Sequence, residues 1–150
     1  MAHLFQISVS TGGVPKLPIT EAFVSETKVG DDLHNHPEHG GLLRAVCLFS
    51  LERILALQAE GNTIFPGAVG ENLTIAGLDW DDLHLGSQLK IGDEVVLEID
   101  TFAPPCGKLR RFLKDFNRIS EDLHPGWARP YCKVLQTGTV RIGDTVTLLD

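Results

Sequence analysis

Cysteine is scarce in this sequence, and no run of apolar residues is long enough to cross a membrane. The three cysteines, Cys47, Cys106 and Cys132, are odd in number and have no C-x-x-C spacing, which argues against a disulfide framework or a zinc knuckle. No segment approaches the roughly 18 consecutive apolar residues that a spanning helix needs, and residues 1–7 do not have the charged and apolar regions of a signal peptide. We therefore expect a cytoplasmic protein that is not inserted in a membrane.

Basic residues are also few, with 13 Lys and Arg against 20 Asp and Glu and a formal net charge of -7. Binding to a nucleic-acid backbone needs a broad basic face, so nucleic acid is not an expected partner. The 150 residues have globular proportions of apolar (43%) and charged (22%) side chains, and they contain no repeat. These features predict a single domain over residues 1–150.

Short strands dominate the secondary structure that the sequence predicts. Alternating or β-branched segments predict strands at residues 4–9, 19–28, 44–49, 88–91, 94–101, 131–135 and 145–149. Ser50 is a suitable N-cap for a helix that runs to Glu60, with Leu51, Ile54, Leu55 and Leu57 facing inward. Residues 62–77 are rich in glycine and predict a functional surface loop. The pattern predicts a mostly-β, barrel-like fold with two or three short helices.

The segment around Cys106 has the properties of a reactive thiol site. Pro104 and Pro105 end the preceding strand, and apolar residues at helical spacing predict a helix that starts at Cys106; they are Leu109, Phe112, Leu113 and Phe116. Four cations follow, at positions 108, 110, 111 and 114. Helix N-termini and nearby cations stabilise thiolates, and such cysteines have pKa values of roughly 3.5–7.5 instead of about 8.5. From this segment alone, a small cysteine packed at a helix start is an equal alternative.

Residues 30–46 contain three closely spaced histidines, His34, His36 and His39. A structural zinc site is not favoured, because no companion cysteine or histidine has a recognised spacing and Pro37 breaks any helix that could align them. His39 instead precedes Gly40 and Gly41, which would let a ligand approach the backbone closely. Arg44 adds a guanidinium for a phosphate or carboxylate.

Residues 70–74 form a third candidate segment. Gly70 precedes Glu71 and Asn72, and a strand-like Leu-Thr-Ile follows. Backbone N–H groups and an amide that both donates and accepts suit a heterocycle such as a pterin. An ordinary connection from a loop to a strand is the alternative. Nearer the C-terminus, residues 124–131 combine a turn, an aromatic residue and Arg129.

Taken in order, these segments resemble the MOSC family, named for the C-terminal domain of molybdenum-cofactor sulfurase. The matching motifs lie at residues 12–16, 30–31, 39–46, 70–74, 105–106 and 134–144, and they cover nearly the whole chain. The resemblance implies a β-barrel-like domain. It also implies an exposed cysteine that either carries sulfur as a persulfide or binds the molybdenum of a pterin cofactor, molybdopterin. Some members of the family reduce N-hydroxylated compounds.

Carried over to this chain, the family's cysteine is Cys106, the expected catalytic residue and metal ligand. The resemblance assigns cofactor binding to residues of the two glycine-containing motifs, His39, Gly40, Gly41, Gly70, Glu71 and Asn72. Arg44 and Arg129 are candidate contacts for the pterin phosphate by their chemistry. The chain departs from the family's reductases at Ser10 to Gly13, where those members have a Lys-Ser-type pair.

Three functions follow as expectations. The first is a molybdenum-cofactor-binding, reductase-type component that acts on N-hydroxylated compounds. Because the sequence has no Cys-rich iron–sulfur segment, its electrons are expected from an electron-donor protein. The second is a sulfur carrier that uses a Cys106 persulfide, loaded by a donor of the cysteine desulfurase type. The third is a non-catalytic module that binds or delivers the cofactor.

Overall fold

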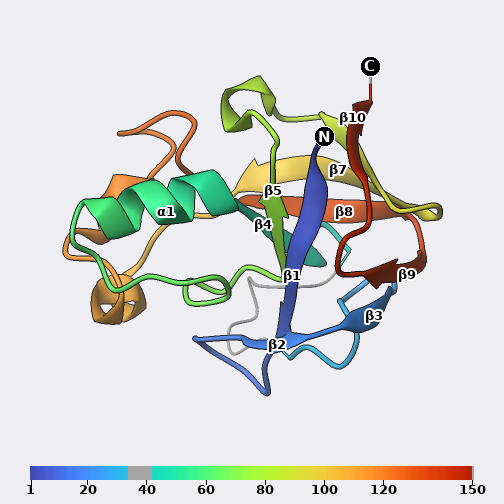
Figure 1. Cartoon of the computed structure of the whole chain (residues 1–150), viewed down its shortest axis with the longest axis horizontal. Helices are drawn as coiled ribbons and strands as arrows, with labels where there is room; N and C mark the ends of the chain where they lie inside the picture. Colours follow the sequence, from blue (N-terminus) through green and yellow to red (C-terminus); the bar gives the residue numbers. More distant parts are fainter. Residues whose placement is uncertain (34–41, 150) are drawn as a thin grey trace.

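The computed structural model of the protein describes residues 1–33 and 42–149, and most of its regular elements are strands (Figure 1). The strands are β1 (His3–Val9), β2 (Leu17–Ile19), β3 (Glu21–Val24), β4 (Val46–Ser50), β5 (Leu73–Ala76), β6 (Gln88–Ile91), β7 (Val95–Phe102), β8 (Pro130–Gln136), β9 (Gly138–Arg141) and β10 (Val146–Leu149). The helical elements in the described residues are α1 (Leu51–Ala59) and the 3-10 helices η1 (Trp80–Asp82), η2 (Gly107–Arg111) and η3 (Phe116–Ile119). The prediction of a mostly-β fold is confirmed.

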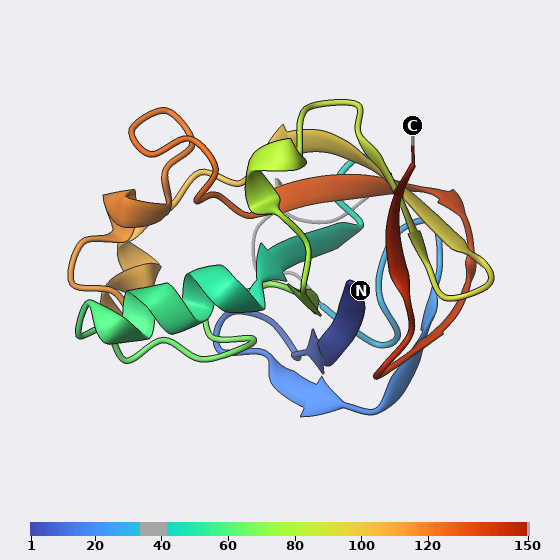
Figure 2. The ribbon, with the colours of Figure 1, turned by 45° about the horizontal axis from the view of Figure 1, so that its top comes forward.

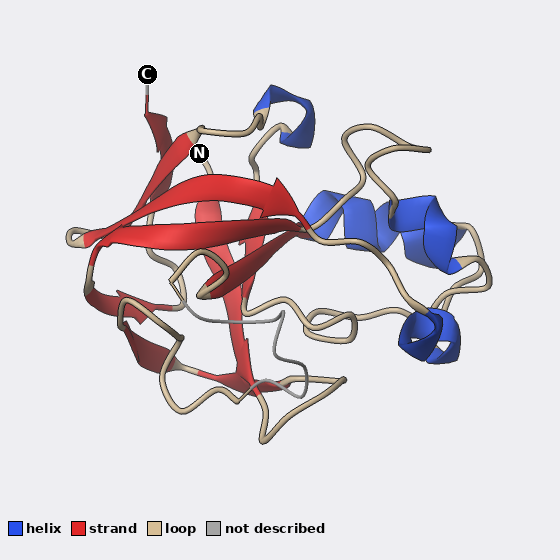
Figure 3. Ribbon diagram, turned by 180° about the vertical axis from the view of Figure 1, so that it is seen from behind, coloured by secondary structure: helices blue, strands red, loops and turns tan. Residues whose placement is uncertain are grey.

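Eight strands form one mixed sheet in the order β10-β6-β7-β8-β4-β5-β1-β2, and β3 pairs with β9 separately (Figure 3). Only β4 and β5, which α1 connects, run parallel among the described pairs. The sheet curls so that His3 in β1 forms a bridge with Thr145, next to the edge strand β10. The backbone N–H of Leu4 donates to the Asp144 carbonyl at 2.8 Å. Within the described residues this contact does not extend the sheet into a closed barrel.

The α1 helix begins where the sequence predicts. The hydroxyl of Ser50 accepts a hydrogen bond from the Arg53 N–H at 3.1 Å, which satisfies one of the free N–H groups of the first turn. Ile54 and Leu57 are buried as predicted. The inward placement of Leu55 is wrong, because this side chain is 52% exposed. The helix contacts β4 and β5 and runs away from the end of the sheet (Figure 2). Arg53 in the helix donates to the Gly126 carbonyl at 3.0 Å, and Glu60, just after the helix, pairs with Arg118 of η3.

The helix predicted after Cys106 is replaced by two separate 3-10 helices. The η2 helix ends at Arg111, and the Lys114 N–H then donates to the Asn62 side chain at 2.9 Å. The carboxylate of Asp115 accepts from the Asn117 N–H and starts η3. Side chains therefore capture the backbone groups that would have continued one helix, while Leu109 and Leu113 still face the core as their spacing indicates.

Other boundaries also differ from the predicted ones. The segment 19–28 is divided between β2 and β3, which belong to different sheets. The predicted loop 62–77 ends in the buried strand β5, and β9 was not predicted. The core fills the interior of the curled sheet, and β4 and β5 are buried along their whole length. In the described residues, no helix is long and apolar enough to span a bilayer.

Candidate functional site

A cavity of about 490 Å³ opens where six chain segments meet at the end of the sheet. The segments are the β1–β2 connection, the segment after β3, the beginning of β4, the loop before β5, the turn after β7 and the beginning of β8. Four of the predicted site residues line this cavity, namely Gly70, Asn72, Cys106 and Arg129. Residues distant in the sequence are therefore gathered into one site.

The other predicted residues have different positions. Glu71 is fully buried and is not part of the cavity lining. Arg44 is half-buried, and its guanidinium lies over the ring of Tyr131, 5.6 Å from the ring centroid. Because Tyr131 lines the cavity, Arg44 contributes to the site through this ring. The positions His34, His36, His39, Gly40 and Gly41 lie outside the described residues.

Cys106 is an exposed thiol on the wall of the cavity. It is the N-cap residue of η2, in extended conformation, and its side chain makes no capping hydrogen bond. The backbone holds this position, because the Cys106 carbonyl accepts from the Leu109 N–H at 3.0 Å and Leu109 is buried. The predicted placement of Cys106 at the start of a helical segment is confirmed, although the segment is a short 3-10 helix. Its sulfur is free to meet a molecule in the cavity.

The charge of the lining differs in sign from that of the whole chain. Lys16, Lys108 and Arg129 line the cavity, and no carboxylate is found among its described lining residues. The formal net charge of the protein is -7. A cluster of cations in a concave site, without lining acids, favours an anionic ligand.

Arg129 connects two walls of the cavity from a buried position. Its Nη1 donates to the Val69 carbonyl in the loop before β5, and its Nη2 donates at 3.4 Å to the Pro104 carbonyl, two residues before Cys106. The Nε atom is buried and has no hydrogen-bond partner. Nearby, the guanidinium groups of Arg53 and Arg118 both stack on the Trp127 ring, at 4.5 and 3.9 Å from its centroid. This stacking braces the segment that carries Arg129.

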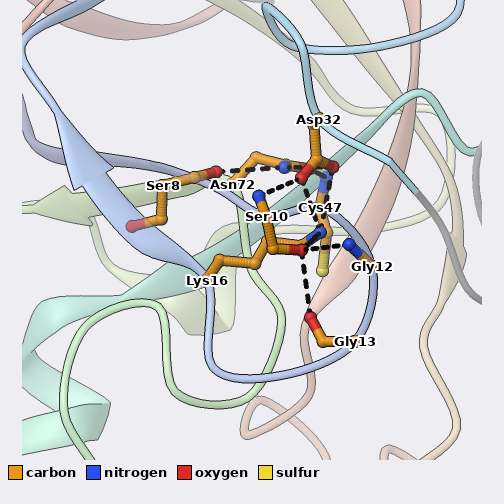
Figure 4. A network of polar contacts seen from close by, with 8 residues as sticks. All are labelled: Ser8, Ser10, Gly12, Gly13, Lys16, Asp32, Cys47 and Asn72. Atoms are coloured by element: carbon orange, nitrogen blue, oxygen red, sulfur yellow. Dashed lines mark hydrogen bonds and ion pairs between the residues drawn. The ribbon is translucent and has the colours of Figure 1, made fainter.

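Lys16, Asp32 and Asn72 form a buried polar network (Figure 4), and two of its members, Lys16 and Asn72, line the cavity. Lys16 Nζ lies 2.8 Å from Asp32 Oδ1 and 2.9 Å from Oδ2. Asn72 Nδ2 donates to Asp32 Oδ2 at 2.9 Å and to the Ser8 carbonyl at 3.2 Å, while Asn72 Oδ1 accepts from the Cys47 N–H at 3.0 Å. The Asn72 side-chain amide therefore links β1, β4 and the segment around Asp32, because its NH2 group donates two hydrogen bonds and its oxygen accepts one.

Gly70 and Glu71 shape the loop before β5. Gly70 has φ +92°, and a Cβ atom there would lie 3.3 Å from Val14 Cγ1 and 3.9 Å from Arg129 Nη1. A side chain would therefore strain the backbone and narrow the cavity. Burial raises the pKa of Glu71 to about 7, against the opposing effects of backbone N–H groups of residues 67, 69 and 71 and of the Arg129 charge.

Two further lining residues stay neutral at physiological pH. Cys47 is buried, as expected, but it also reaches the cavity, and burial raises the pKa of its thiol to about 12. Burial likewise raises the pKa of the Tyr131 hydroxyl. Cys132 is buried in β8, the strand position that the sequence predicted, and does not line the cavity. The exposed Cys106 and the buried Cys47 are therefore chemically different thiols in one site.

Sequence reasoning missed the roles of Lys16, Asp32 and Tyr131. Lys16 ends one motif that supported the family resemblance and Asp32 directly follows another, but nothing in their local sequence indicates that they pair. Tyr131 was predicted as the first residue of the strand 131–135 and as part of an aromatic and arginine pattern, and neither prediction placed it at the site. Their positions depend on contacts between segments that are far apart in the chain.

A model of the MOSC domain matches residues 35–147. A protein of Gibberella moniliformis named "Reductase" is 33% identical over 132 residues, which are 85% of this chain and 24% of that protein. The Bacillus subtilis protein YflK is 29% identical over 140 residues, covering 91% of this chain and 63% of its own length. The chain thus spans less than two thirds of each of these relatives.

Solved structures share the fold. YiiM from Geobacillus stearothermophilus has a TM-score of 0.74 and 21% identity, and the match covers 100% of this chain and 76% of YiiM. The YuaD protein of Bacillus subtilis has a TM-score of 0.73 and 16% identity, with 97% of this chain and 94% of YuaD covered. At this level of identity the likeness concerns the fold.

Proposed function

Because the chain belongs to the MOSC domain family, we propose that it binds the molybdenum cofactor in the large cavity, with Cys106 as the molybdenum ligand. We propose further that it is a reductase-type component that acts on N-hydroxylated compounds. The observation that carries this proposal is a cavity in an acidic protein that combines an exposed thiol with the cations Lys108 and Arg129 and has no carboxylate among its described lining residues. The third lining cation, Lys16, is paired with the buried Asp32.

The residues of the cavity fit such a cofactor. A cysteine sulfur is a soft ligand of the kind that suits a metal with thiolate chemistry. Arg129 and Lys108 supply positive charge for a phosphate, and the unpaired Nε shows that the hydrogen-bonding capacity of Arg129 is incompletely used. The absence of a side chain at Gly70 leaves room for a flat ring beside Val14. The Asn72 amide lies in the same wall.

When bound, the cofactor supplies the redox centre for a two-electron reduction. The residues of the chain would hold and surround it: Cys106 anchors the metal, the cations neutralise the phosphate, and Val14, Val69 and Leu109 exclude water. Reduction of an N–OH group to N–H consumes two electrons and two protons and releases water. We propose that a partner protein delivers the electrons. The "Reductase" name of the Gibberella relative supports this class of reaction.

The test is metal and pterin analysis of protein purified from a host that makes the cofactor. We expect molybdenum and a fluorescent pterin oxidation product in the wild type, and loss of most molybdenum in Cys106→Ala. Cys132→Ala is the matched control, because it removes a thiol that does not line the cavity. A wild-type protein without molybdenum, or equal molybdenum in Cys106→Ala, contradicts the proposed ligand role.

A second candidate function, sulfur carriage by a Cys106 persulfide, is favoured by the exposure of this thiol. A sulfur donor of the cysteine desulfurase type would be the partner. Incubation with a desulfurase and cysteine should then add the mass of one sulfur atom to the wild type and none to Cys106→Ser. Retention of bound pterin without reductase activity, when electron donors are supplied, would instead favour a module that stores or delivers the cofactor.

A cytoplasmic location is part of this proposal. The three cysteines are free thiols in the structure, and the reducing environment of the cytoplasm keeps thiols in this state. A Cys106 that is not tied up in a disulfide is also required for the ligand role and for sulfur carriage.

A further inference from the structure

Glu71 and Arg129 each contain one buried polar atom without a hydrogen-bond partner, Oε1 in the carboxyl group and Nε in the guanidinium. Buried polar atoms are nearly always hydrogen-bonded, so an unpaired acceptor in Glu71 and an unpaired donor in Arg129 require an explanation. Arg129 lines the cavity, whereas Glu71 lies behind the lining and is completely buried.

The loop of residues 67–71 links the two side chains. Backbone N–H groups of residues 67, 69 and 71 stabilise the carboxyl group, and the Val69 carbonyl of the same loop accepts from Arg129 Nη1. Arg129 donates to two carbonyl groups and not to Glu71, so the two side chains interact through space without sharing a hydrogen bond. The Arg129 guanidinium therefore lines the cavity and also contacts the loop that carries the buried Glu71 carboxyl group.

The other charged groups near Glu71 largely compensate one another. Lys16 and Asp32 form their own ion pair. Lys16, Cys47 and Arg129 line the same cavity, whereas Asp32 and Glu71 are buried and are not among its lining residues. The Thr74 hydroxyl is 3.5 Å from Glu71 Oε2 and carries no charge. The positive charge of Arg129 is consequently the one that an ionised Glu71 carboxylate would offset.

We propose, resting on the proposed function, that Glu71 is a positioning residue that sets the anion affinity of the cavity, so that binding of an anion at Arg129 is accompanied by uptake of one proton at Glu71. The proton comes from solvent and converts the carboxylate to a carboxylic acid; no electrons are transferred. The physical basis is competition, because the carboxylate and the bound anion interact with the same guanidinium in a poorly solvated site.

Near neutral pH, both forms of Glu71 are available for this coupling, since burial raises its pKa to about 7. A bound anion disfavours the charged carboxylate and therefore favours the protonated form. Linkage is reciprocal: an anion that changes the protonation equilibrium of Glu71 tenfold must bind about tenfold more tightly to the protonated protein.

Sulfate is a suitable probe, because its own charge does not change between pH 6 and pH 8. Calorimetric titration of the full-length, cofactor-free protein should give tighter sulfate binding at pH 6 than at pH 8, by about three- to tenfold. Titrations at pH 7 in buffers with different ionisation enthalpies should show net proton uptake. Glu71→Gln, a neutral isostere, should bind sulfate with little dependence on pH and take up no proton. Glu26→Gln, which alters an exposed carboxylate, should behave as the wild type.

Three results would overturn the proposal: no sulfate binding at either pH, no proton uptake by the wild type, or the same pH dependence in Glu71→Gln. The measurement of proton uptake uses the wild type alone, so it stands even if the variant does not fold. Sulfate contains neither pterin nor metal. If the protein takes up a proton with sulfate but binds no molybdenum, the proposed cofactor is contradicted and the coupling of anion binding to Glu71 protonation stands. If it binds molybdenum but takes up no proton with sulfate, only the coupling is contradicted.

Discussion

Lys16 and Asp32 form a buried ion pair in which both carboxylate oxygens lie within 2.9 Å of Lys16 Nζ. The two side chains are 7% and 0% exposed, and Asp32 also accepts from the Ser10 N–H and from Asn72 Nδ2. The pair holds the β1–β2 connection against the segment after β3 and places the Lys16 side chain in the cavity lining. It thus links the stability of the fold to the shape of the site.

Asp32→Ala should destabilise the protein strongly, because it leaves a buried ammonium group without its partner. Removal of one member of a buried pair typically costs about 3–5 kcal/mol of unfolding free energy. Urea unfolding followed by circular dichroism measures this effect. Glu21→Gln is the comparison, since it breaks an exposed pair with Arg141 at 3.0 Å and should change stability little. Similar losses in both variants would contradict the structural role of the buried pair.

The stability of the protein should contain a pH-dependent contribution from Glu71. Its pKa is about 7 in the folded state against 4.5 ordinarily, so the native state binds more protons between these pH values and stability falls as pH rises. The contribution is fully present below pH 4.5 and is lost as pH rises through about 7, a change on the order of 3 kcal/mol.

Glu71→Gln removes this ionisation, so the stability of the variant relative to wild type should increase from pH 4.5 to pH 8. Urea unfolding of the two proteins across this range gives the difference, in which contributions from other carboxylates cancel. A difference that does not change with pH would show that Glu71 ionises normally in the folded protein.

Cys106 should be the thiol that reacts in the native protein. It is exposed, whereas Cys47 and Cys132 are buried and their pKa values are raised by burial. Titration with Ellman's reagent should modify one thiol per native chain and all three of the sequence after denaturation. Cys106→Ser should abolish the native reaction, and fast modification of this variant would place a second accessible thiol in the cavity.

Gly70→Ala should reduce anion binding as well as stability. Gly70 has φ +92°, and its new Cβ would approach Val14 and Arg129 in the cavity wall. Gly143→Ala is a close control, because Gly143 also has φ +92° and nothing lies within 4 Å of the position of the new Cβ. In both variants the strained backbone should lower the free energy of unfolding by about 1 kcal/mol or more. Only Gly70→Ala should also weaken sulfate binding. Equal binding in the two variants would argue against a ligand beside Gly70.

Local features of the sequence were sufficient to predict much of the secondary structure. Alternation identified β1, strand-forming residues identified β6, β7, β8 and β10, and Ser50 marked the beginning of α1, because strand patterns and capping depend on neighbouring residues. The same reasoning failed for the segment after Cys106, where Asn62 captures the Lys114 N–H. A hydrogen bond from a segment 52 residues away cannot be inferred from helical spacing.

The sequence by itself determined the family and the mostly-β class, and it identified Cys106 as the candidate reactive thiol, because ordered motifs and local periodicity are written along the chain. Only the tertiary structure decided which side chains share the site. The buried pairing of Lys16 with Asp32, the position of Arg129 between two loops and the burial of Glu71 arise from strand pairing and chain crossings. Burial and ion pairing determine which side chains are charged and which are neutral, and both exist only in the folded chain.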